Sequence, residues 1–264
     1  MFSEAIEILL LLPLAFVLIA YALSAWLSRF EPRRSARPGT MLFWLCKEYY
    51  WMIIYLFIAT FVSPFDQMVR KKKWNFQVDE KGGPLIVILH GYLSVPTHWL
   101  PLQKKLKRRG FKNILRYSYH SLAGSIEAWS TELAKRMEPF HEHGIVFVGH
   151  SMGGVVAAWA ASKMPKGSVK KIITMGSPFA GTLMADFALT FNARKLYPYT
   201  PEIEKTKKLL EELDPDIEFV CLWSRFDQLI VPPESAAPER ARAVEMKGLG
   251  HTGYHFEADI SRFI

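Results

Sequence analysis

The pentapeptide Gly149-His150-Ser151-Met152-Gly153 places a serine between glycines at the spacing of a nucleophile on a tight turn. It follows the apolar run Gly144–Val148 and precedes Gly154–Ala161, a helical stretch of mostly small residues. A serine on such a turn projects its hydroxyl above the sheet, and the helix N-terminus can stabilise negative charge there. The pattern predicts a nucleophilic Ser151; without a base and an acid, Ser151 would be only a helix N-cap.

An acid and a base follow Ser151 along the chain. Asp227 comes after the strand-like run Ile217–Trp223, and His251 lies in the glycine-rich loop Gly248–Gly253. A serine hydroxyl is a weak nucleophile on its own, so His251 would take its proton, and Asp227 would orient the imidazole and stabilise its cation. We expect Ser151, Asp227 and His251 to form a catalytic triad.

Alternatives to the acid and the base remain open. His255 lies four residues beyond His251, but it precedes Phe256 and is expected to begin a helix packed on the core. Glu234 is the reserve for the acid. Asp214 and Asp216 precede the strand-like run Ile217–Trp223 rather than follow it, and Asp186 lies in the segment expected to form a cap.

The motifs resemble those of the α/β-hydrolase superfamily and, within it, of bacterial lipases and esterases. The matching segments are His90-Gly91-Tyr92, Gly149–Gly153, Met175–Thr182 and the loops of Asp227 and His251, so the resemblance covers roughly Pro84 to the C-terminus. The order Ser, Asp, His is typical of this superfamily. Phe179 stands where lipases commonly carry histidine, a departure that leaves the nucleophile untouched.

The oxyanion formed on a substrate carbonyl needs preorganised donors. The backbone N–H of Met152, directly after the nucleophile, is one. The resemblance to lipases implies that Tyr92 gives the other, with Leu93 as a possible substitute. His90 and His150 are expected to be structural.

Apolar runs alternate with helical patterns from about residue 74 onwards, which predicts an α/β fold with a mostly parallel central sheet flanked by helices. The hydrolase domain would occupy residues 74–264. A change of pattern at about 179–213 predicts a small cap insertion, whose apolar residues could line an acyl pocket. The expected strands lie near residues 85–89, 113–117, 145–148, 172–175, 217–222 and 243–246, and the expected helices near 99–109, 125–138 and 155–164.

Residues 1–73 are expected to anchor the protein in a membrane through a helix at about 6–28. Ile8–Leu27 is 20 residues long and uncharged, so as a helix it would span about 30 Å, the thickness of the hydrocarbon core. A cleaved signal peptide would begin with basic residues, whereas Glu4 and Glu7 begin this segment. Trp26 and the arginines between 29 and 37 suit a retained anchor with a cytoplasmic flank.

A second apolar helix is predicted at about 41–65. The pair Lys47-Glu48 interrupts it, so either a helical bundle carries the pair or the segment lies partly in the headgroup layer, and whether it spans the membrane stays open. Arg70–Lys73 follows as a solvated hinge or a contact to anionic lipid. Because basic residues flank both ends, the side on which the catalytic domain lies is open; the expected location is the bacterial inner membrane.

The remaining composition excludes several other functions. The net charge is +8, but no nucleic-acid motif or stacking ladder accompanies the basic cluster at 104–112, so we expect no nucleic-acid partner. Cys46 and Cys221 are too few for a disulfide framework. We expect no metal and no cofactor, because the histidines outside the motifs lack metal-ligand spacing with acids or cysteines: His98, His120, His141 and His143.

Together these features predict a membrane-anchored serine hydrolase that cleaves carboxylic esters of lipids or other hydrophobic acyl esters through an acyl-enzyme. The same triad could serve an acyltransferase or a thioesterase. A noncatalytic membrane scaffold with a retained hydrolase fold is the alternative outside catalysis.

Overall fold

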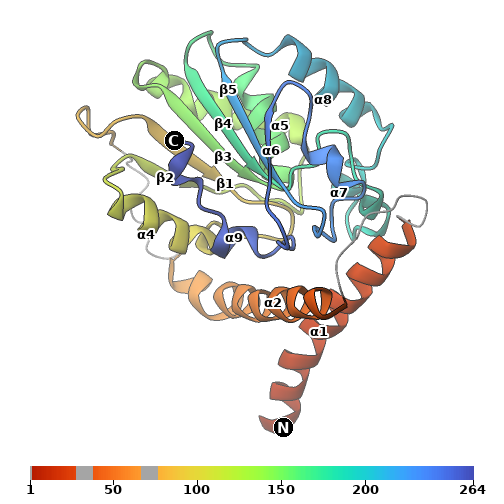
Figure 1. Cartoon of the computed structure of the whole chain (residues 1–264). Coiled ribbons are helices and arrows are strands. Elements are labelled where there is room, and N and C mark those ends of the chain that lie inside the picture. Colours follow the sequence, from red (N-terminus) through yellow and green to blue (C-terminus); the bar gives the residue numbers. More distant parts are fainter. Residues whose placement is uncertain (1, 28–37, 67–76) are drawn as a thin grey trace.

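The structure, a computed structural model, describes residues 2–27, 38–66 and 77–264 (Figure 1). Two predicted basic clusters, at 29–37 and at Arg70–Lys73, lie outside the described residues.

Six parallel strands form one sheet in the order β2-β1-β3-β4-β5-β6. The predicted parallel α/β sheet is therefore confirmed. The strands are β1 (Leu85–Leu89), β2 (Ile114–Tyr117), β3 (Ile145–His150), β4 (Val169–Met175), β5 (Glu218–Trp223) and β6 (Arg242–Glu245).

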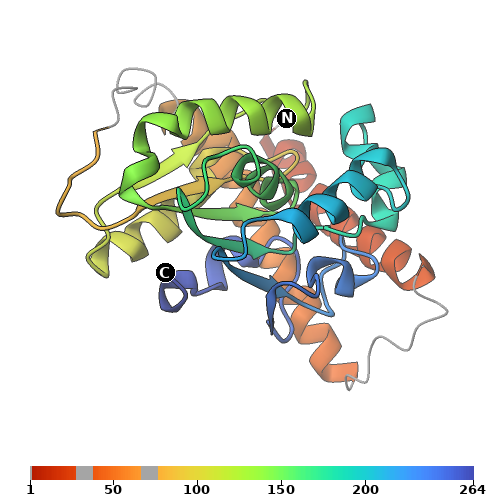
Figure 2. The ribbon, with the colours of Figure 1, turned by 90° about the horizontal axis from the view of Figure 1, so that it is seen from above.

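Helices cover both faces of this sheet (Figure 2). The α-helices are α4 (Leu100–Arg108), α5 (Ile126–Met137), α6 (Met152–Ala161), α7 (Phe191–Arg194), α8 (Pro201–Glu212) and α9 (Tyr254–Glu257). The short 3₁₀ helices are η2 (Pro96–Trp99), η3 (Glu138–His143), η4 (Leu183–Phe187), η5 (Pro233–Ala236) and η6 (Ile260–Arg262).

Strand β1 shows how an unbroken apolar run serves two cores. Side chains alternate between the faces of a strand, so Leu85, Val87 and Leu89 pack with α5, α6 and α8, while Ile86 and Ile88 pack with α4 and α9. All five are fully buried. Covered faces on both sides are what a parallel sheet requires.

Helix α5 illustrates how local sequence sets an element. The hydroxyl of Ser125 caps it by accepting the N–H of Ala128 at 3.1 Å. The buried residues recur with helical spacing, so one stripe faces the sheet: Ile126, Trp129, Leu133 and Met137.

The chain reverses its direction across the sheet between β1 and β3, because β2 lies on one side of β1 and all later strands lie on the other. Ligands of open α/β sheets bind outside the carboxyl ends of the strands at such a switch point. The loop at Gly91 and the turn at Ser151 follow these two strands directly.

The segment predicted as a cap, 179–213, contains two kinds of structure. Residues 183–200 hold η4 and α7, which contact each other. Helix α8 instead packs on α6, where the Trp159 Nε1–H donates to Thr206 Oγ1 at 2.8 Å and Ile203 is fully buried.

Two long helices, α1 (Phe2–Leu27) and α2 (Pro38–Phe57), precede the sheet. A π-helical turn, η1 (Ile58–Val62), continues α2. Among the described residues, Leu10–Leu27 and Gly39–Asp66 are long and apolar enough to cross a membrane.

Helix α2 runs along the carboxyl edge of the sheet, and α1 projects away from the domain (Figure 1). The Tyr55 hydroxyl donates to the Leu93 carbonyl, after β1, at 3.3 Å. Beyond α2, Asp66 forms a partly buried bidentate ion pair with Arg116 of β2, with N···O distances of 2.7 and 3.0 Å. The C-terminal part of this helical segment is thus joined to β2 and to the loop after β1, which border the predicted site.

Candidate active site

Ser151 lies on a sharp turn between β3 and α6. Its φ of 55° and ψ of −129° are rare for a residue with a side chain. The Ser151 N–H donates to the Met175 carbonyl at 2.9 Å, which fixes the turn against β4. Strain of this kind is found where a side chain must be held in a functional position.

Two glycines of the pentapeptide make this turn possible. A Cβ on Gly149 would lie 2.4 Å from the Gly154 Cα, and a Cβ on Gly153 would lie 2.5 Å from the His90 carbonyl oxygen. The glycine spacing is therefore a steric requirement of the turn that presents Ser151.

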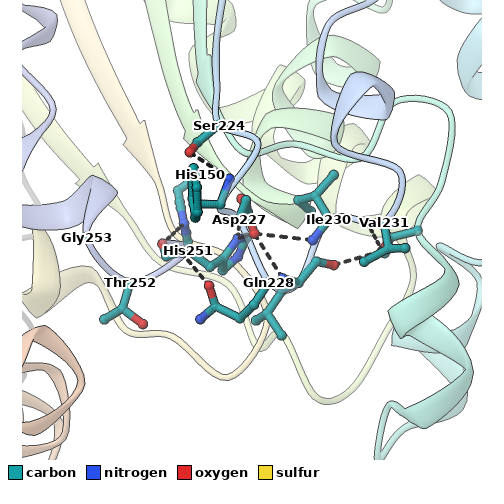
Figure 3. A network of polar contacts seen from close by, with 12 residues as sticks. His150, Ser224, Asp227, Gln228, Ile230, Val231, His251, Thr252 and Gly253 are labelled. Atoms are coloured by element: carbon teal, nitrogen blue, oxygen red, sulfur yellow. Dashed lines mark hydrogen bonds and ion pairs between the residues drawn. The ribbon is translucent and has the colours of Figure 1, made fainter. Parts of the chain in front are cut away.

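Asp227 and His251 form a buried pair (Figure 3). The His251 Nδ1–H donates to the Asp227 carboxylate, 2.9 Å from Oδ1 and 2.8 Å from Oδ2. Oδ1 also accepts the N–H groups of Leu229 and Ile230 at 3.0 and 3.2 Å. These bonds hold the carboxylate in place and leave Nε2 of His251 as the basic nitrogen.

The serine turn and the acid–base pair border the same short segment, Met175-Gly176. Met175 accepts the Ser151 N–H, and a Cβ on Gly176 would lie 2.5 Å from Asp227 Oδ2 and 3.4 Å from His251 Nδ1. His150, beside the serine, donates from Nε2 to the His251 carbonyl at 3.0 Å. The three residues of the predicted triad are thus gathered at the carboxyl ends of β3, β5 and β6.

The alternative acids and base lie in other surroundings. His255 is buried in α9 and stacks on Trp99, with ring centroids 4.4 Å apart. Glu234 and Asp186 are exposed. Asp214 accepts the N–H of Gly167 at 3.1 Å.

The predicted oxyanion donors flank Ser151. Met152 is the first residue of α6, where the N–H has no intrahelical acceptor. Tyr92 and Leu93 form the turn after β1, with Leu93 at φ 54°, and a Cβ on the preceding Gly91 would lie 2.9 Å from the Ser151 Cβ. The donor roles of Met152 and Tyr92 remain predictions.

A comparison with solved structures shows that this chain shares its fold with lipases and esterases. The mature Bacillus licheniformis lipase BlEst2 superposes with a TM-score of 0.56 at 14% identity, over 66% of this chain and 87% of that one. The Paleococcus ferrophilus monoacylglycerol lipase gives 0.53 at 14% identity, over 69% and 95%. The chain has the α/β-hydrolase fold.

Two further comparisons concern the same domain. Residues 112–214, which include the serine turn, match the model of the PGAP1-like alpha/beta domain. A structure from work on carboxylesterases of Nitrososphaera gargenis has a TM-score of 0.53 at 13% identity, over 71% of this chain and 89% of that one. None of the curated proteins compared with the chain matches it.

The sequence analysis missed two residues beside the candidate site, Glu48 and Gln228. Gln228 donates from Nε2 to Glu48 Oε1 at 2.9 Å and accepts the His251 N–H on its own Oε1 at 3.0 Å. The available signal was the charged pair Lys47-Glu48 inside an apolar helix, which predicted either a bundle or an interfacial helix.

Three buried histidines beside the site are held neutral. Burial and then the neighbouring histidines lower the pKa values of His150 and His255 well below the ordinary value. Burial lowers the pKa of His98 to about 4. The His98 Nε2–H donates to the Tyr55 carbonyl and Nδ1 accepts from Ser94, both at 3.0 Å, which suits the neutral ring.

The pKa of His98 predicts acid lability. The folded value is about 4 and the ordinary value is 6.5, so the unfolded chain binds more protons between these values and the free energy of unfolding falls as the pH drops below about 6.5. From pH 7.5 to 5 we expect a loss of about 2 kcal/mol from His98. Urea unfolding followed by tryptophan fluorescence measures the free energy of unfolding at the two pH values. Between them, His98→Gln should lose about 2 kcal/mol less than the wild type. Equal pH dependence in both proteins would contradict it.

The described residues hold no group of three or more His, Cys, Asp or Glu side chains that could bind a metal ion.

Proposed function

We propose that this protein is a membrane-anchored serine hydrolase that cleaves carboxylic esters of lipids or other hydrophobic acyl esters through an acyl-enzyme intermediate. The observation that carries this proposal is the strained Ser151 turn beside the buried Asp227–His251 pair, bordering one segment at the switch point of the sheet. The likeness of the fold to lipases and esterases supports it.

The chemistry follows from the roles that this geometry permits. Ser151 Oγ attacks the ester carbonyl while His251 Nε2 takes its proton, and Asp227 stabilises the imidazolium through Nδ1–H. The backbone N–H groups of Met152 and Tyr92 stabilise the oxyanion. His251 then protonates the leaving alcohol, and water releases the acyl group by the same steps in reverse.

Exposed apolar surface supports both the anchor and a hydrophobic substrate. Helix α1 exposes several large side chains, and η4 of the insertion contacts it. Apolar side chains are also exposed on the insertion, so the two surfaces together would suit a bilayer. The exposed residues on α1 are Leu10, Leu11, Leu12, Phe16, Leu18, Ile19 and Trp26, and those on the insertion are Phe187, Leu189, Phe191, Tyr197 and Tyr199.

One experiment on the full chain tests both parts of the proposal. Membranes from expressing cells are extracted with alkaline carbonate, and the pellet is assayed on p-nitrophenyl esters of increasing acyl length, the matching thioesters and an acceptor alcohol. We expect the protein to stay in the pellet and to hydrolyse esters, with longer chains preferred. Release into the supernatant would overturn the anchor. Turnover of thioesters alone, or acyl transfer without hydrolysis, would overturn the ester assignment.

A further inference from the structure

Glu48 on α2 is a buried carboxylate that the proposed reaction does not use. Its Oε1 accepts the Thr252 N–H at 2.7 Å and Gln228 Nε2 at 2.9 Å, and its Oε2 accepts the Gly253 N–H at 3.2 Å. Burial raises the pKa of Glu48, and the hydrogen bonds from Gln228 and Thr252 oppose that rise. All three partners are donors, which favours the ionised carboxylate. A charge that is 1% exposed is retained only where such partners compensate for lost water.

These partners belong to the two loops that carry the acid and the base. Gln228 follows Asp227, and Thr252 and Gly253 follow His251. The Gln228 amide also accepts the His251 N–H, so one side chain joins both loops to Glu48 (Figure 3 shows the Gln228 and His251 part). Glu48 is therefore the shared acceptor of both loops.

Trp44, one helical turn before Glu48, fits against the same two loops. Its ring lies on Phe226, the residue before Asp227, with centroids 3.9 Å apart. A Cβ on Gly248 would lie 2.1 Å from Trp44 Nε1, and a Cβ on Gly250 would lie 2.3 Å from the Glu48 carboxyl carbon. The glycines around His251 thus leave the space that α2 occupies.

One face of α2 makes all these contacts, because the residues recur at helical spacing. Trp51 stacks on Phe256 with centroids 4.6 Å apart, and Tyr55 stacks on His98 at 3.6 Å. Lys47 pairs with Glu257 at 3.0 Å. The charged pair Lys47-Glu48 thus faces the hydrolase domain.

We propose that Glu48 is a positioning residue that holds the Asp227 and His251 loops together, which makes α2 a structural part of the catalytic site. The inference rests on the proposed ester hydrolysis. The two loops follow β5 and β6, at the edge of the sheet, and β6 is only four residues long. A displacement of the base by about 1 Å can lower turnover by about a hundredfold.

The test replaces Glu48 by glutamine in the full-length protein in detergent. An amide can accept on one atom only, and its NH₂ would face the N–H of Thr252 or Gly253. We expect kcat to fall by about ten- to a hundredfold with KM within about threefold. The amide that faces the NH₂, that of Thr252 or Gly253, should exchange at least about tenfold faster in hydrogen–deuterium exchange, because it loses its acceptor.

The pH dependence gives a readout that a purely structural role would not change. His251 is faced by Asp227, His150, Tyr254 and Glu48. A negative charge on Glu48 favours the protonated imidazole, so the acid limb of the pH profile of kcat should move to lower pH in Glu48→Gln.

The matched control is Lys47→Gln, on the neighbouring residue of the same helix, whose ion pair with Glu257 is partly exposed. Activity should stay within about twofold, since such pairs contribute little. If Glu48→Gln does not fold, Gln228→Met tests the same link, with an expected loss of about tenfold in kcat.

An unchanged kcat and acid limb in folded Glu48→Gln, with Ser151→Ala inactive, would overturn the positioning role and leave the hydrolase proposal standing. Wild-type protein without ester turnover would overturn the hydrolase proposal. The exchange measurement would then still decide whether Glu48 holds the loop.

Discussion

Ser151→Ala is expected to lower kcat for ester hydrolysis by about five to six orders of magnitude. The reason is that no other hydroxyl can replace one held on a strained turn, bonded to Met175 and adjacent to the acid–base pair. A fluorophosphonate probe should label the wild-type protein at Ser151 and leave the variant unlabelled. Stopped assays with a p-nitrophenyl ester, combined with mass spectrometry of the labelled peptide, measure both effects.

Ser162→Ala is the matched control, at the other end of α6. Its hydroxyl donates to the Trp159 carbonyl at 2.9 Å and is remote from the site. Activity should stay within about twofold of the wild type. Undiminished turnover by Ser151→Ala, or labelling at a different residue, would refute the assignment of the nucleophile.

Asp227→Asn should lower kcat by about 10⁴-fold. The aspartate accepts the His251 Nδ1–H and two backbone N–H groups. An asparagine that keeps the backbone bonds on its oxygen turns its NH₂ towards His251 Nδ1, which moves the ring proton to Nε2. Such an imidazole cannot accept the serine proton. Steady-state kinetics on the same ester measure the loss in kcat.

Asp186→Asn makes the same chemical change on the exposed insertion and should have little effect. Thermal unfolding of both variants separates catalysis from folding. A loss of less than about tenfold in folded Asp227→Asn would show that another acid orients His251.

The sequence predicted much of the sheet because apolar runs such as Leu85–Leu89 are unambiguous when both faces of a strand are buried. The pentapeptide around Ser151 was informative for a steric reason, since its glycines are needed wherever strand and helix meet so closely. Spacing along the chain also indicated Asp227 and His251, because each follows a strand that ends at the same edge.

The part that could not be predicted is the docking of α2. A charged pair in an apolar helix has several explanations, and the partners of Glu48 are backbone groups that leave no side-chain pattern. The sequence showed Gly248 and Gly250 only as members of a glycine-rich loop, whereas in the structure each faces a side chain of α2. The sequence could not separate α8 from the rest of the predicted insertion at 179–213, because α8 has a normal amphipathic pattern and only its packing on α6 assigns it to a layer.

The bond between Glu48 and the Thr252 N–H joins residues 204 positions apart. During synthesis, α2 leaves the ribosome long before the loop that it clamps. A chain that has folded only through β4 carries Ser151 without its base. The proposed catalytic site would therefore stay incomplete until the acid and base loops have emerged and closed onto the helix made first.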